Sequence, residues 1–98
     1  MTADLREIDP AELRLPRSRS SGADPFKLHR QIAKFGKSVA GMPPLIAYEG
    51  SDGVLELTDG VTRATRVALL LPGTTVQVEV IGKLKRPKAQ NRRVGDAL

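Results

Sequence analysis

Residues 55–67 decide how this chain folds, and they read LELTDGVTRATRV. The pattern predicts a short strand, a tight turn at Asp59-Gly60, and a helix whose first turn holds Thr62 and Arg63. The first N–H groups of a helix have no partner within it, and the macrodipole makes that end positive. A glycine that permits close approach, a hydroxyl and a guanidinium therefore predict a cradle for an anion, which we expect to be a phosphate.

The residues on either side of this stretch predict the rest of a small sheet. Residues 45–48 (LIAY) read as a strand, which a Gly-Ser-Asp-Gly turn joins to the strand 54–58 in a hairpin. The helix after the hairpin should extend to about residue 71, because Pro72-Gly73 follows. Residues 75–81 alternate between apolar and polar side chains, which predicts a half-buried strand.

The N-terminal half predicts one more strand and one more helix. Residues 5–8 read as a strand, and residues 9–13 as a single helical turn that an aspartate and a proline begin. The polar residues 14–22 have no period and predict a loop. A second Asp-Pro pair begins a helix over 25–35, which Gly36 should end.

Each predicted helix has two distinct faces. The first is expected to present a core face (Leu28, Ile32, Phe35) and a basic stripe (Lys27, Arg30, Lys34 and Lys37). The second is expected to present a core face (Val61, Ala64, Ala68, Leu71) and a polar face (Asp59, Thr62, Arg63, Arg66). The predicted fold class is α+β, with two amphipathic helices over a small mixed sheet formed by residues 1–81.

Composition excludes several classes of function. The 98 residues include no cysteine, which rules out disulfides and thiol catalysis and suits a reducing cytoplasm. A single histidine makes a transition-metal site improbable, and we expect no metal-binding residues. No apolar run approaches the roughly 20 residues that cross a bilayer, and no signal peptide is evident, so no membrane partner is expected.

Positive charge is concentrated at the C-terminal end. Residues 1–81 contain ten basic and ten acidic side chains, whereas residues 82–98 contain six basic and one acidic. Such a block is usually a solvated or disordered tail, and it often contacts nucleic acid. The expected nucleic-acid-binding residues are Lys83, Lys85, Arg86, Lys88, Arg92 and Arg93.

The order of elements and several motifs resemble the ParB/sulfiredoxin superfamily. The motifs are Ile-Asp-Pro-Ala-Glu-Leu at 8–13, Gly-Met-Pro-Pro-Leu-Ile at 41–46, Leu-Thr-Asp-Gly-Val-Thr-Arg-Ala at 57–64 and Val-Glu-Val-Ile at 78–81. The family includes the CTP-binding partition protein ParB, ATP-using sulfiredoxins, a free-serine kinase and nuclease-like domains, and its Gly-x-x-Arg turn holds nucleotide phosphates. The resemblance implies that Gly60 and Arg63 contact phosphate, with Asp59 before the turn and Thr62 next to the arginine.

Departures from the family pattern weaken the expectation of catalysis. The cysteine of sulfiredoxins is missing from the turn. Val61 stands where related proteins have His or Glu, and valine can neither move a proton nor bind a metal. The helix-turn-helix domain of partition proteins is not expected in these 98 residues. The fold can therefore be retained while the catalytic side chains are lost.

Several residues keep more than one interpretation. Asp59 can cap the helix, pair with a nearby arginine, or act as an acid/base group with a metal–phosphate complex. Glu12 is either a capping-box partner or a second catalytic carboxylate. Arg17 and Arg19 either close over a ligand or are solvated. The basic stripe of the first helix could bind a phosphate backbone, or it could serve only to keep the helix soluble.

Two functions follow, with a third ranked last. The first is a nucleotide- or phosphate-binding module in which Arg63 and Thr62 contact a nucleoside triphosphate with Mg²⁺, Arg66 adds positive field, and the basic block attracts DNA or RNA. The second is a non-catalytic module that binds a protein partner. A small nuclease comes last, because only Asp59 is well placed and Glu12 and Glu56 are remote. If the protein is an enzyme, it is a nucleoside triphosphatase or a nuclease.

Overall fold

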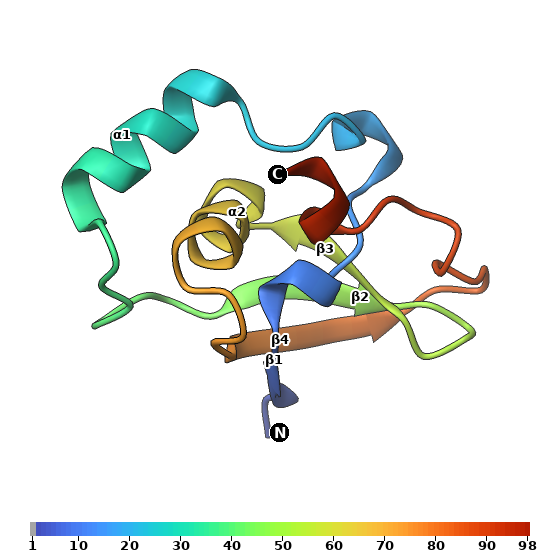
Figure 1. Ribbon diagram of the computed structural model, residues 1–98. Helices are drawn as coiled ribbons and strands as arrows, with labels where there is room; N and C mark the ends of the chain where they lie inside the picture. The colour runs from blue at the N-terminus through green and yellow to red at the C-terminus, as the bar shows by residue number, and fades with distance from the viewer. Residues whose placement is uncertain (1) are drawn as a thin grey trace.

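The computed structural model describes residues 2–98, which form a four-stranded mixed sheet with helices on one side (Figure 1). The elements in chain order are β1 (Leu5–Ile8), η1 (Pro10–Glu12), η2 (Arg17–Arg19), α1 (Pro25–Phe35), β2 (Leu45–Glu49), β3 (Leu55–Asp59), α2 (Val61–Leu70), β4 (Val76–Lys83) and η3 (Val94–Ala97). This architecture confirms the predicted α+β class.

The sheet has the strand order β1-β4-β2-β3. The predicted hairpin is present, since β2 and β3 pair antiparallel, with Ala47 opposite Leu57. The connection through α2 then places β4 parallel to β2, with Leu45 opposite Val78. β1 closes the other edge by pairing antiparallel with β4. The parallel pair arises because a helix separates β3 from β4 and returns the chain across the sheet.

The core lies between the sheet and α2. Apolar residues of β2, β3 and β4 face the apolar side of α2, and the short turns η1 and η3 cover the rest of that face (Figure 1). Its buried members are Leu13, Leu15, Leu45, Ala47, Leu55, Leu57, Val61, Ala64, Val67, Ala68, Val76, Val78 and Val94. The predicted core face of α2 is thus confirmed, and aliphatic side chains fill the interior.

The helix α1 differs from its predicted environment. It begins and ends where the sequence indicates, with the Asp24 side chain accepting from the Phe26 N–H and Gly36 at φ 55°. No residue of α1 is buried, however, and Phe35 on the expected core face remains 40% exposed. The reason is that α1 lies over α2 and not over the sheet, so its apolar side meets only one neighbour (Figure 1).

Residues 82–98 do not extend from the domain as a tail. The Leu15 N–H donates to the Arg92 carbonyl and the Val94 N–H to the Leu13 carbonyl, which adds two short extended segments beyond β3. Val94 is 1% exposed within the core. The expected boundary at residue 81 is therefore wrong, because β4 runs to Lys83 and Val94 belongs to the same hydrophobic core.

One carboxylate fastens this C-terminal segment to the β2–β3 turn. Asp52 accepts from the backbone N–H groups of Lys88 and Ala89 at 2.9–3.1 Å, and from the Val54 N–H at 3.2 Å. Desolvation of the Asp52 carboxyl is outweighed by these hydrogen bonds, so its pKa lies below the usual range.

Among residues 2–98, no helix has the length and hydrophobicity needed to cross a bilayer.

Candidate functional site

The junction of β3 and α2 is shaped by Gly60. This residue has φ 97° and ψ 22°, a left-handed conformation that side chains other than glycine rarely adopt. A Cβ atom here would lie 2.6 Å from Leu45 Cδ2 and 3.0 Å from an Arg63 guanidinium nitrogen. The glycine is therefore required by the fold itself, and it also allows Arg63 to lie against the turn.

The start of α2 has no side-chain cap among the residues that the structure describes. By contrast, Asp9 caps η1 and Asp24 caps α1, each through a hydrogen bond from a backbone N–H. The interpretation of Asp59 as the helix cap is wrong, because Gly60 occupies the capping position and no N–H of the first turn donates to Asp59. The amide groups at this helix start are left for another acceptor.

Arg63 lies across the turn and is held by two partners. One guanidinium nitrogen donates to the Pro43 carbonyl at 2.9 Å, and the other contacts the Asp59 carboxylate at 3.4 Å. The Arg63 side chain is 19% exposed, whereas that of Asp59 is 68% exposed. The bond to Pro43 fixes the guanidinium, while the long, exposed contact to Asp59 is weak and can give way to a stronger anion.

Two further cations from other elements line the same hollow. A cavity of about 220 Å³ at the helix start is bounded by Arg19 from η2, Lys27 from α1, and Arg63. The remaining lining residues are Gln31, Asp59, Gly60, Val61 and Thr62. The phosphate ligands predicted from the sequence do not include Arg19 or Lys27. A signal for each was present, because Arg19 lies in the loop that can close over a ligand and Lys27 belongs to the basic stripe of the first helix. Only the tertiary fold brings these three cations together.

Arg66 does not share this hollow. It is 1% exposed, and one of its nitrogens donates to the Gly36 and Ser38 carbonyls at 2.8 Å each. Its guanidinium also lies 5.4 Å from the centre of the Phe35 ring. Burial lowers the pKa of Arg66 from its ordinary value. The expected outward position of Arg66 is wrong, and its side chain instead fastens the loop after α1 onto α2.

The other carboxylates proposed for chemistry are engaged elsewhere. Glu12 pairs with Arg93 at 3.3 Å, and Glu56 pairs with Lys88 at 3.1 Å and accepts from the Asn91 amide at 2.6 Å. Across residues 2–98, no group of three acidic or histidine side chains is arranged to hold a metal ion. Asp59 is thus the one carboxylate at the turn, and Val61 beside it is buried.

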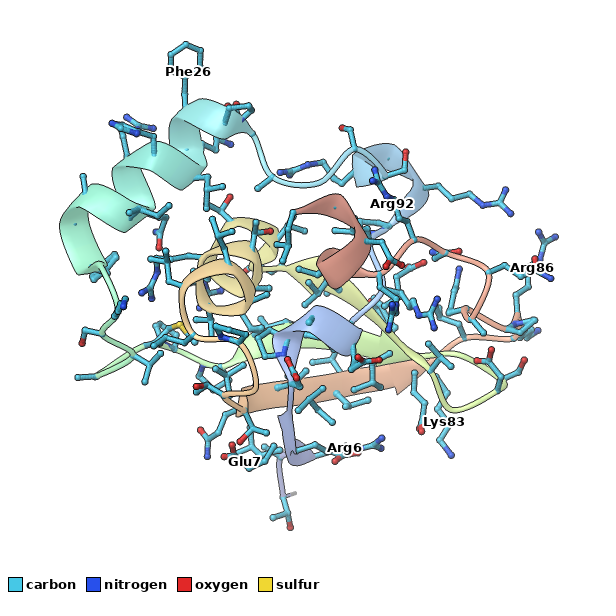
Figure 2. All side chains as sticks on the ribbon, in the orientation of Figure 1. Arg6, Glu7, Phe26, Lys83, Arg86 and Arg92 are labelled. Atoms are coloured by element: carbon cyan, nitrogen blue, oxygen red, sulfur yellow. The ribbon has the colours of Figure 1, made fainter. Side chains whose placement is uncertain are left out.

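Several basic side chains of residues 82–98 form contacts within the protein. Lys88 and Arg93 form the ion pairs just described, and Arg92 donates to the Ser20 and Asp96 carbonyls. The remaining cations, Lys83, Lys85 and Arg86, form no ion pair with any residue in 2–98. Lys83 and Arg86 point away from the body of the molecule (Figure 2).

Comparison with known proteins adds no family assignment. No protein-family model matches the chain, and no functionally characterised protein matches it significantly.

Proposed function

We propose that this protein binds the phosphate groups of a nucleotide at the start of α2, as a module of the ParB/sulfiredoxin type. The phosphates would accept from the free amides that follow Gly60 and from the Arg63 guanidinium. Arg19 from η2 and Lys27 from α1, which line the same hollow, would add attraction.

The observation that carries this proposal is the uncapped start of α2 beneath three cations. The positive side chains around this helix start repel one another, and the unpaired amide N–H groups lack an acceptor. A bound anion relieves both effects. The one nearby acid, Asp59, compensates only one of the three charges and is mostly exposed. An anion of charge −2 or more therefore fits this hollow better than a neutral ligand does.

Magnesium would enter with the nucleotide. Mg²⁺ is usually held by substrate phosphates together with one or two carboxylates and water. Asp59 and the Thr62 hydroxyl, which both line the hollow, are the groups that could complete such a shell. Turnover is not part of the proposal, because no second convergent carboxylate or histidine is present in the described chain.

Isothermal titration calorimetry with each nucleoside triphosphate and Mg²⁺ tests the proposal. We expect saturable binding by the parent protein and a large loss of affinity in Arg63→Ala. The matched control is Arg6→Ala, which removes another partly exposed arginine that pairs with a carboxylate, Glu49, away from the cradle. Absence of binding at millimolar nucleotide, with Arg63→Ala the same as the parent, would refute the proposal.

A second candidate function is a module that binds a protein partner. It is favoured by the outer face of the sheet, which no helix covers (Figure 1) and on which Leu5 and Ile81 are 47% and 48% exposed. A pull-down that recovers one defined protein tests this alternative. Recovery that survives Arg63→Ala but fails when Leu5 and Ile81 are replaced by serine would support it over nucleotide binding.

A further inference from the structure

A groove between α1 and α2 continues from the anion cradle. It has a volume of about 510 Å³ and is lined by Lys27, Arg30, Gln31, Lys34, Phe35 and Thr62. Lys27, Gln31 and Thr62 line both the groove and the hollow at the helix start. The two spaces therefore adjoin, and basic side chains of α1 line both.

The charge of this groove is unbalanced. Lys27, Arg30 and Lys34 form no ion pair within residues 2–98, and α1 contains no acidic residue. Lys34 lies seven positions after Lys27, a rise of about 10.5 Å along the helix. Three cations in a row along one wall complement a chain of several negative charges better than a single small anion.

Two other features of the groove bear on its occupant. Gln31, which lines the groove, has a buried Oε1 atom with no hydrogen-bond partner among residues 2–98. Phe35, which also lines the groove, is 40% exposed, and the Lys34 Nζ atom lies 5.2 Å from the centre of its ring. An exposed ring beside cations is the combination on which unpaired bases stack in proteins that bind single strands.

We propose that the α1–α2 groove binds a single-stranded nucleic acid. Its phosphates would follow Lys27, Arg30 and Lys34, one phosphate would occupy the cradle beside Arg63, and a base would stack on Phe35. This inference rests on the proposed function, because both use the same cradle. It places nucleic-acid binding in the groove and not on residues 82–98.

Fluorescence anisotropy of a labelled 15-nucleotide oligothymidine, measured over a range of salt concentrations, tests the proposal. The variant Arg30→Gln/Lys34→Gln removes two groove cations that do not line the cradle. The matched control is Lys85→Gln/Arg86→Gln, which removes two exposed cations outside the groove. Both variants lose the same net charge, so only the position of the charge differs.

We expect the groove variant to reduce the slope of log K against log salt by about 1.4, since each single-strand phosphate contact contributes about 0.7. If affinity at 1 M salt is unchanged, that slope corresponds to about 25-fold weaker binding at 0.1 M. The control should match the parent. Phe35→Leu, which retains an apolar side chain but no ring, should weaken binding about fivefold or more.

Three outcomes would overturn the inference: no retention of the oligonucleotide, equal losses in the two double variants, or binding only to vesicles of anionic phospholipid. Nucleotide titration of the same groove variant separates this inference from the proposed function. Unchanged nucleotide affinity together with no oligonucleotide binding would remove the groove proposal and leave the cradle proposal intact.

Discussion

Replacing Gly60 with alanine should damage the fold more than the same change at another left-handed glycine. Placing a non-glycine residue in the left-handed conformation costs about 1–2 kcal/mol. At Gly60 the new Cβ would also lie 2.6 Å from Leu45 Cδ2, and Leu45 is 0% exposed. Overpacking of this kind costs about 1–3 kcal/mol, because a close-packed core cannot move aside. The total expected loss in free energy of unfolding is about 2–5 kcal/mol.

Gly53 supplies the matched control. It has φ 80°, and a Cβ added there would meet nothing within 4 Å. Gly53→Ala should therefore cost only the backbone term of about 1–2 kcal/mol. Urea denaturation of both variants measures the difference, which we expect to be about 1–3 kcal/mol. In thermal melts, each kcal/mol should lower Tm by about 4–8 °C in a domain of this size.

A double-mutant cycle with Leu45→Val tests whether the clash is the cause. Removing a methyl group from the side chain at position 45 makes room near the turn, so Gly60→Ala should cost less in that background than in the parent. Equal cost in both backgrounds, or Gly60→Ala no worse than Gly53→Ala, would refute the reasoning. Either result would mean that the turn can shift away from Leu45 without loss of stability.

Other perturbations test the remaining structural assignments. Arg66→Met should lower the free energy of unfolding by about 2–3 kcal/mol, since two backbone carbonyls lose a charged donor, and chemical denaturation would show this; no change would mean that the loop 36–38 is held by other contacts. Val94→Ala should cost about 1–3 kcal/mol by the same assay, whereas a truly detached tail would give no effect. Asp52→Asn should lower Tm at neutral pH. Because the pKa of Asp52 is lowered in the folded protein, its contribution to stability is complete above the unfolded pKa near 4 and is lost as pH falls through the folded pKa. Below pH 4, a plot of Tm against pH should therefore be flatter for the variant than for the parent. Parallel plots would contradict this.

Local patterns in the sequence predicted the elements well. The two Asp-Pro pairs identified the starts of η1 and α1, because a short acceptor followed by a fixed φ suits a helix start wherever it lies. Alternation predicted β4, and the Asp59-Gly60 pair predicted the turn before α2. These features depend on a few neighbouring residues, which is why they could be read without the fold.

Long-range packing decided the properties that local patterns could not. Helical periodicity placed Arg66 on the polar face of α2, but α1 and its following loop cover that side and bury the guanidinium. Composition indicated a basic tail, yet one valine in it, Val94, fits the core beside Leu13. Helical periodicity does not tell which elements pack against each face of a helix. The net charge of a segment likewise does not tell which of its side chains form contacts with the rest of the protein.

The proposed anion cradle combines both kinds of information. Residues 55–67 alone predict the strand, the tight glycine turn and the helix start that carries Arg63, because these features follow from backbone sterics and from unpaired amides within one short stretch. The fold, in contrast, brings Arg19 and Lys27 into the lining of the hollow at that helix start and places a basic groove along α1. Arg19, Lys27 and Arg63 come together only because the chain connections bring distant residues side by side. A local sequence pattern does not specify where such a connection ends in space.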